Sequence, residues 1–160
     1  MNEFAENIEY HFRPNRHLLR VWLFAGSLLL SQSAFAVVCT ISSAGGLAFG
    51  SYDVFNATNL DGAGTINISC DVSAPFTTAL SAGGGTFATR TLASGANLLN
   101  YNLYTDAART TIWGDGTAGT VTLSGSAAPA ATQTVFGRIP ARQNKPVGSY
   151  ADTIVLTLTF

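Results

Sequence analysis

The fold of this chain is decided by the stretch GSYADTIVLTLTF, residues 148–160. Apolar and mostly polar residues alternate along its second half. One face carries Ile154, Leu156, Leu158 and Phe160, and the other carries Val155, Thr157 and Thr159. A period of two with β-branched residues predicts a β-strand that has one face in a hydrophobic core. Because a strand has hydrogen-bonding groups along both edges, this one needs a neighbour on each side.

The first 36 residues have the layout of a secretory signal peptide. Arginines at positions 13, 16 and 20 precede an apolar run at 21–30, and Ala34-Phe35-Ala36 supplies small residues at a cleavage position. The apolar run is short for a membrane span, which needs about 20 residues, so an uncleaved anchor is only the alternative. We expect a signal peptide over residues 1–36, one domain over residues 37–160 and a secreted product.

Residues 37–160 carry few charges and contain no histidine, glutamate or methionine. Lys145 and four arginines face six aspartates, which gives a net charge of −1. There is no basic stripe for nucleic acid or for a membrane surface. Catalysis by histidine is excluded, and aspartates in turn-like contexts usually bind backbone amides. We therefore predict that the protein is not an enzyme and binds no metal and no cofactor. The aspartates are Asp53, Asp61, Asp71, Asp106, Asp115 and Asp152.

Cys39 and Cys70 are the only two cysteines of the sequence. A single pair in an exported chain predicts a disulfide. Each cysteine lies on the apolar face of a short alternating segment, so we expect the bond to join two strands inside the core. The alternative, a metal or redox pair, has neither a C-x-x-C spacing nor a histidine to support it.

Short apolar segments separated by glycine, asparagine and proline make up the rest of the domain. We expect about nine short strands and no helix, which is typical of an antiparallel β-sandwich. The polar stretch 56–64 is expected to be a loop, residues 112–113 to precede a turn, and residues 106–109 to form a single turn. The expected strands are 37–41, 47–49, 66–72, 76–80, 87–92, 98–104, 120–123, 133–139 and 154–160.

Three aromatic residues beside glycine- or alanine-rich stretches have two interpretations. Trp113, Phe55 and Phe87 could be exposed on loops, where they would attach to a surface or stack on a sugar. They could equally close the ends of the sandwich core. The core interpretation is favoured for Phe87. Both interpretations stay open for Trp113 and Phe55, which are the candidates for an adhesive loop.

Two motifs are specific enough to indicate a family. One is Tyr101-Asn-Leu-Tyr104 followed by Asp106-Ala-Ala-Arg109, and the other is Gly148-Ser-Tyr-Ala-Asp-Thr153 before the terminal strand. Further matching elements are Cys39-Thr40, Leu47-Ala-Phe-Gly-Ser-Tyr-Asp53, residues 65–70, Arg90-Thr-Leu92, Trp113-Gly-Asp-Gly116 and Val135-Phe-Gly-Arg-Ile-Pro140. With these motifs the chain resembles the spore coat protein U domain family, which includes the subunits of archaic, Csu-type chaperone–usher pili.

The resemblance implies an incomplete immunoglobulin-like β-sandwich that lacks its final strand. In such pilins an apolar groove lies open between the first and last strands of the chain. A periplasmic chaperone lends a strand to the groove, an outer-membrane usher assembles the fibre, and another pilus subunit finally donates the strand. By this resemblance the groove wall would consist of Ile154, Leu156, Leu158 and Phe160, and basic chaperone residues would hold the terminal carboxylate. The protein would pass through the periplasm to the cell surface and act in attachment and biofilm.

The chain departs from this family pattern before its first cysteine. A donor strand needs on the order of ten alternating residues, whereas only Val37 and Val38 stand between the expected cleavage position and Cys39. We therefore expect a subunit that accepts a strand without donating one, at the tip or end of a fibre or in a coat. The alternative is a self-contained secreted module that is adhesive or binds carbohydrate.

Overall fold

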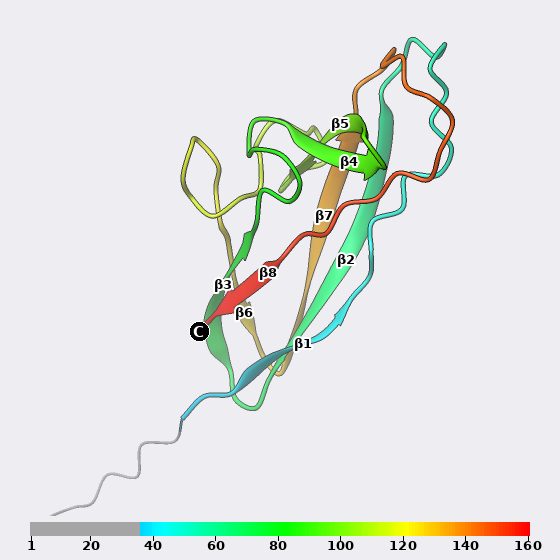
Figure 1. The fold of residues 1–160 in the computed structure, drawn as a ribbon. Helices are drawn as coiled ribbons and strands as arrows, with labels where there is room; N and C mark the ends of the chain where they lie inside the picture. Colours follow the sequence, from blue (N-terminus) through cyan, green and yellow to red (C-terminus); the bar gives the residue numbers. More distant parts are fainter. Residues whose placement is uncertain (1–35) are drawn as a thin grey trace, which may run out of the picture. The chain divides into compact units, whose positions relative to one another are not determined.

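The computed structural model describes residues 36–160, which form eight β-strands and, within that range, no helix (Figure 1). The strands are β1 (Cys39–Ala44), β2 (Leu60–Cys70), β3 (Ala74–Leu80), β4 (Arg90–Ser94), β5 (Asn97–Tyr104), β6 (Leu123–Ala127), β7 (Ala130–Ile139) and β8 (Leu156–Thr159). None of the described residues builds a helix with the length and apolarity that a membrane crossing requires. The expected signal peptide lies outside the described residues, apart from Ala36, and stays a prediction.

The strands form two antiparallel sheets. The larger has the order β1-β2-β7-β5-β4, and the smaller has the order β6-β3-β8. The pairing of β2 with β7 is the longest and runs from Leu60 opposite Ile139 to Ser69 opposite Ala130. Strand β8, red in Figure 1, pairs with β3 from Leu156 opposite Leu80 to Thr159 opposite Thr77. The predicted all-β antiparallel sandwich is confirmed.

The core lies between the two sheets and is built from alternate residues of each strand. Phe76 and Leu80 of β3 face Ile68 of β2 and Ile139 of β7, and each of the four is at most 4% exposed. Burying an aliphatic or aromatic side chain of this size contributes about 1.5–3 kcal/mol. The alternating patterns of these strands therefore bring their buried side chains together in one contiguous hydrophobic cluster.

Trp113 belongs to this core and not to an adhesive loop. Its side chain is fully buried, and its Nε1 donates a hydrogen bond of 3.2 Å to the carbonyl of Thr78. The interpretation of Trp113 as a surface contact is therefore wrong. The neighbouring residue, Gly114, is also buried. A side chain at this position would collide with Thr120, so the glycine allows the chain to pack closely beside the indole. Phe87, for which the core interpretation was favoured, is half-buried and lies outside the core cluster, with its ring 5.5 Å from the guanidinium of Arg90.

The largest difference from the predicted elements concerns residues 60–64. They were expected to belong to a loop because the stretch 56–64 is polar, yet they form the first half of β2. Their partners come from β7, which is more than 70 residues away in sequence, so long-range pairing overrides the local preference of glycine. Residues 47–49, expected as a strand, belong to no strand of the structure. The single turn at 106–109 is confirmed by a hydrogen bond from Arg109 N to Asp106 O.

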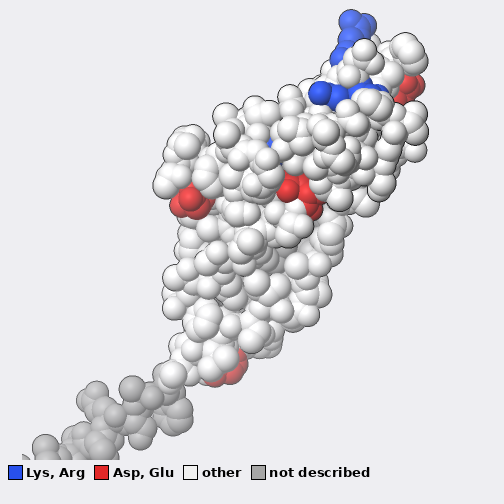
Figure 2. All heavy atoms as spheres, viewed as in Figure 1, with Lys and Arg blue, Asp and Glu red and all other residues white. Residues whose placement is uncertain are grey.

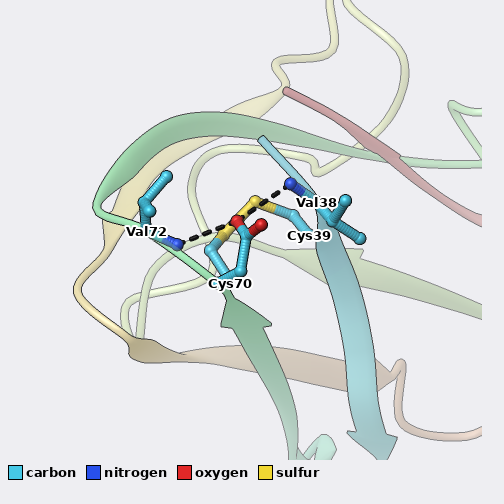
Figure 3. The surroundings of a disulfide bond; sticks show 5 residues. Val38, Cys39, Cys70 and Val72 are labelled. Atoms are coloured by element: carbon cyan, nitrogen blue, oxygen red, sulfur yellow. Dashed lines mark hydrogen bonds between the residues drawn. A yellow bond between two sulfur atoms is a disulfide. The ribbon is translucent and has the colours of Figure 1, made fainter. Parts of the chain in front are cut away.

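The disulfide joins the first two strands, as predicted (Figure 3). Cys39 and Cys70 lie directly opposite each other in the β1–β2 pair, with 4.1 Å between their Cα atoms, and both are buried. Beside them, Asp71 Oδ1 accepts hydrogen bonds from the backbone amides of Val38 at 3.0 Å and Val72 at 2.8 Å. Closing a loop of this length stabilises a domain by roughly 3–4 kcal/mol. The start of β1 is thereby fastened to the end of β2.

Candidate functional site

An apolar cavity of about 300 Å³ lies between the two sheets. On one side lie the end of β1 and residues 45–49, and on the other lie β8 and the residues that lead into it. The floor is formed by inward residues of β2, β3, β5 and β7. The apolar lining residues are Leu47, Phe49, Ile66, Leu80, Leu92, Leu103, Val135, Ile154 and Leu156, and Tyr101 and Asp152 add polar atoms.

The wall formed by β8 agrees in part with the four residues predicted for it. Ile154 and Leu156 line the cavity, and Leu158 is half-buried against the core without lining it. Phe160 is 56% exposed and does not line the cavity. Within residues 36–160, β8 pairs with β3 alone, so its second edge has no strand partner there. This edge presents free backbone donors and acceptors beside an apolar opening.

The opposite wall contains residues 47–49, which sequence reasoning did not assign to the groove. Leu47 and Phe49 lie over Gly62 of β2 and Gly137 of β7, two inward positions that have no side chain. A Cβ atom added at Gly137 would lie 2.6 Å from Cζ of Phe49. The phenyl ring also packs edge-on against Tyr101, with 6.0 Å between ring centroids. The sequence signal that could have indicated this wall is the alternation of the apolar residues Leu47 and Phe49 in a stretch bounded by glycines.

A second, wider cavity of about 750 Å³ continues from the first. It lies between residues 47–54 and residues 145–152, and both cavities share Leu47, Phe49, Leu92 and Asp152. The two cavities therefore form one groove along the open side of the sandwich. We call this continuous feature the groove below.

One carboxylate, that of Asp152, lies where the two cavities meet. Its Oδ2 accepts a hydrogen bond of 2.6 Å from the hydroxyl of Tyr101, and its Oδ1 accepts from Gly84 N at 3.0 Å and Thr153 N at 2.8 Å. Burial of the phenol, and then its bond to Asp152, raise the pKa of Tyr101 well above its ordinary value of 10.0. At neutral pH Tyr101 is thus a proton donor that holds Asp152 at the edge of the groove.

The arrangement so far is a sandwich whose last strand has a free edge beside an apolar groove. The family model described as Spore Coat Protein U domain matches residues 25–157. The chain belongs to this family. One relative of this Spore Coat Protein U domain is Protein U of Myxococcus xanthus, which is 33% identical over 139 residues, 76% of this chain and 77% of that protein.

A solved structure similar to this Spore Coat Protein U domain is a chain of the CsuC–CsuE chaperone–tip adhesion subunit pre-assembly complex, from the archaic chaperone–usher Csu pili of Acinetobacter baumannii. The TM-score is 0.58 at 19% sequence identity, over 78% of this chain. This chain spans 40% of the length of that one. The likeness shows a shared immunoglobulin-like fold, as the sequence predicted.

Several motif residues of the Spore Coat Protein U domain form a buried polar network around Arg90. The guanidinium is completely buried and donates to Asn102 Oδ1 at 2.6 Å, to Ser81 O at 2.8 Å and to Trp113 O at 2.7 Å. Burial lowers the pKa of Arg90 from its ordinary value. The network ties β4 and β5 to the loop after β3 and to Trp113, so it sets the position of the strands that form the groove floor.

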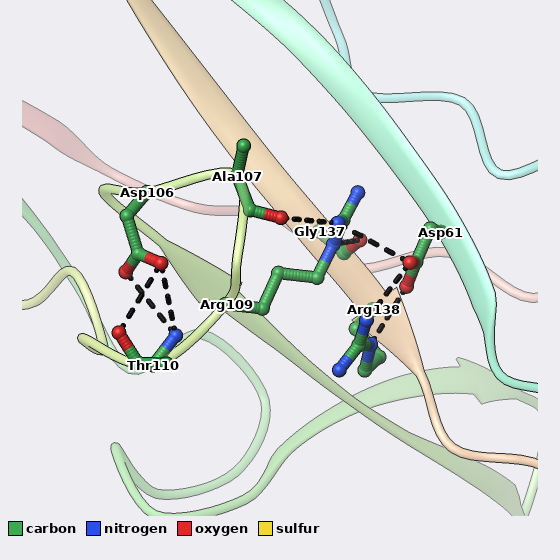
Figure 4. Close-up of polar contacts among 7 residues, drawn as sticks. All are labelled: Asp61, Asp106, Ala107, Arg109, Thr110, Gly137 and Arg138. Carbon is green, nitrogen blue, oxygen red and sulfur yellow. Dashed lines mark hydrogen bonds and ion pairs between the residues drawn. The ribbon is translucent and has the colours of Figure 1, made fainter.

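A second network fastens the 106–109 turn to the outside of the larger sheet (Figure 4). Asp61 of β2 binds Arg138 of β7 through two contacts of 2.7 and 2.9 Å, and its Oδ2 lies 3.2 Å from Arg109. Arg109 also donates to the carbonyl of Gly137 at 3.0 Å. The hydrogen bond from Arg138 lowers the pKa of Asp61. Asp61 is thus a strand residue, although a turn was expected at this position.

The remaining aspartates have the backbone-binding roles that their turn-like contexts predicted. The carboxylate of Asp106 accepts from the amides of Thr110 and Thr111, and that of Asp115 accepts from the amide of Thr117. In the described part of the chain no three histidine, cysteine, aspartate or glutamate residues cluster as a metal site. The aspartates are thus occupied in holding loops, which leaves the groove as the candidate site.

The loops at and near the outer end of the groove carry exposed apolar residues. Phe55 is 89% exposed, and Val147, at the edge of the second cavity, is fully exposed. Phe55 therefore lies at the surface, as one of its two interpretations required. Figure 2 shows that uncharged residues form most of the face that contains β8 in Figure 1.

Proposed function

We propose that the groove binds a β-strand supplied by a partner protein, so that this domain is a structural subunit completed from outside. The observation that carries the proposal is the free edge of β8 beside the apolar groove, with Ile154 and Leu156 turned into it. An incoming strand would bond to the backbone of β8 and place alternate side chains on the groove floor. Main-chain bonds give affinity in this mode of recognition, and the pockets for side chains give specificity.

The partners that fit this groove are a periplasmic pilus chaperone and, in the assembled fibre, the donor strand of another subunit. The family supports this assignment, and so does the shared fold with a chain from a chaperone–tip adhesion subunit complex. An outer-membrane usher would assemble the subunits at the cell surface. The role is therefore structural, in a pilus or coat that serves attachment and biofilm, and not enzymatic.

A terminal position in the polymer is a second element of the proposal. If the signal peptide is removed after Ala36, only Val37 and Val38 precede β1, and the amide of Val38 is already bound by Asp71. Such a subunit accepts a strand and has none to donate. Mass spectrometry of the exported protein tests this point. A mature N-terminus ten or more residues upstream would contradict the terminal position and leave strand acceptance unaffected.

Strand acceptance is tested with a labelled ten-residue peptide that alternates valine and threonine between terminal lysines. Binding to the exported protein is followed by fluorescence anisotropy and thermal unfolding. A ligand at 100 times its Kd stabilises the folded state by about 2.7 kcal/mol. The control peptide has proline in place of the two central threonines, which removes backbone donors and keeps the apolar face. The proposal is contradicted if both peptides bind equally well, and also if neither peptide binds.

A second candidate function is that of a self-contained adhesive or carbohydrate-binding module. The exposure of Phe55, at 89%, is the specific observation that favours it. The two functions differ in their need for a partner. A self-contained module folds as a stable monomer that the alternating peptide does not stabilise further, whereas a strand acceptor unfolds or aggregates readily until the peptide is added.

A further inference from the structure

We propose that residues 47–49 form a plug that covers part of the groove in the unpartnered chain and moves off its floor when a partner strand enters. This inference rests on the proposed function. It adds a competing segment from within the chain, so that binding of the strand includes displacement of Leu47 and Phe49.

The plug packs against a floor made of glycine. Gly62 and Gly64 of β2 and Gly137 of β7 are inward positions whose missing side chains are replaced by Leu47 and Phe49. A Cβ added at Gly62 would lie 3.2 Å from both side chains, and one at Gly137 would lie 2.6 Å from Phe49. The two residues therefore occupy space that a larger floor residue would fill. Apolar side chains of an incoming strand would fit the same space.

The backbone of the plug is attached weakly. Gly45 N donates to Thr65 O at 2.9 Å, but the backbone groups of residues 46–52 make no hydrogen bond within the described residues. Gly45 and Gly46 precede the plug, and Gly50, at φ 78°, follows it. Glycines allow large changes of φ and ψ at little steric cost. Side-chain contact, and not a strand ladder, holds the plug in place, and flexible residues flank it.

The first of the two cavities, which lies under the plug, has too little room for a strand while the plug is in place. The cavity of about 300 Å³ is lined by Leu47 and Phe49 on one side and by Ile154 and Leu156 on the other. This volume equals the lower end of pockets for small molecules, about 300–1,000 Å³. A strand brings its backbone as well as its side chains. Strand β8 is paired with β3, and the floor under the plug is held by the long pairing of β2 with β7. The plug is therefore the wall that can move.

A disulfide that fixes the plug to the floor tests the inference. Cβ of Leu47 lies 3.5 Å from the Cβ position of Gly64, within the range of about 3.5–4.5 Å found across disulfides. The variant Leu47→Cys/Gly64→Cys is oxidised, and its bond pattern is checked by peptide mapping. The matched control is Leu47→Ser/Gly64→Ser, which has similar side chains and no bond. Both are mixed with the alternating valine–threonine peptide described above.

We expect the bridged variant to bind the peptide at least tenfold more slowly or more weakly than the serine control. Equal rates and affinities in the two variants overturn the plug and leave the strand-binding function intact. If neither variant nor the unaltered protein binds the peptide, the proposed function fails and the plug fails with it. The two failures are therefore distinguishable.

A second measurement does not depend on the engineered bond. The single variant Leu47→Cys is treated with a thiol-alkylating reagent, with and without saturating peptide. Displacement from the glycine floor exposes the thiol, so alkylation becomes faster when the peptide is bound. Alkylation that is slower or unchanged with bound peptide overturns the inference, because the side chain has then stayed under the inserted strand.

Discussion

The hydroxyl of Tyr101 donates a hydrogen bond of 2.6 Å to Oδ2 of Asp152, which joins β5 to the segment that leads into β8. Tyr101 lies in the larger sheet and Asp152 in the segment before β8, and the two residues meet where the two cavities of the groove join. Asp152 is also bound by the amide of Gly84 at 3.0 Å, so one carboxylate holds three segments together. The position of the free edge of β8 therefore depends on a buried phenol that keeps its proton.

We predict that stability falls above about pH 10 because of Tyr101. Its pKa is raised in the folded state, so the folded protein binds this proton more tightly than the unfolded chain does. The stabilisation is fully present below the ordinary value of 10.0 and is lost as the pH rises beyond it. Denaturant unfolding at pH 7 to 11 measures the trend. In Tyr101→Phe the loss above pH 10 should be smaller, and an identical loss contradicts the assignment.

We predict that Arg90→Lys is far more destabilising than Arg138→Lys. Arg90 is completely buried and donates to three segments through a fork that lysine does not reproduce, so several carbonyl groups lose their donor. Leaving buried polar groups without partners costs about 1–3 kcal/mol each. The side chain of Arg138 is 29% exposed and pairs at the surface, where such bonds contribute about 0–1 kcal/mol. Chemical unfolding of both variants measures the difference, and similar losses contradict it.

The glycine floor gives a third prediction. Gly137→Ala should lower the free energy of unfolding by about 1–3 kcal/mol, because its Cβ would lie 2.6 Å from Phe49. Gly46→Ala is the control, since no atom lies within 4 Å of its added Cβ. In a Phe49→Ala background the cost of Gly137→Ala should shrink, and a double-mutant cycle measures this coupling. A cost that is the same in both backgrounds shows that Phe49 does not fill the space above Gly137.

Much of the fold was predictable because local patterns and tertiary structure agree. The alternation of Ile154, Leu156 and Leu158 set the inward face of the last strand, and a single pair of cysteines in a chain expected to be exported made the bond between Cys39 and Cys70 predictable. The shift of residues 60–64 from loop to strand was not predictable, because the glycines there are required by Leu47 and Phe49 lying above them. Such a requirement is visible only when segments distant in sequence come together.

The motif residues were recognisable without their roles being evident. Arg90, Asn102 and Asp152 fill internal polar networks, whereas the groove is lined mainly by ordinary aliphatic residues. A sequence pattern marks the polar groups because few replacements satisfy their hydrogen bonds. The same pattern does not distinguish an apolar side chain that lines a groove from one in a closed core, because both positions favour the same residue types.

We predict that Phe55→Ser reduces attachment of the exported protein to hydrophobic surfaces without changing its stability. Phe55 is 89% exposed, so its replacement removes little buried area. Adsorption to polystyrene beads measures attachment, and thermal unfolding checks the fold. Thr58→Ser, in the same loop and also exposed, serves as the control. Unchanged adsorption of Phe55→Ser contradicts an adhesive role for this loop.

The groove itself is tested by two neighbouring residues of β8 that point in opposite directions. Leu156 is half-buried and lines the cavity, whereas Thr157 is exposed on the other face of the same strand. Leu156→Asp should abolish binding of the alternating peptide, because a carboxylate would be buried without a partner against the inserted strand. Thr157→Asp should bind with an affinity within about threefold of the unaltered protein, a difference of about 0.7 kcal/mol. Because both variants place the same charge one residue apart, an equal loss in the two would show that the peptide does not recognise the groove face of β8.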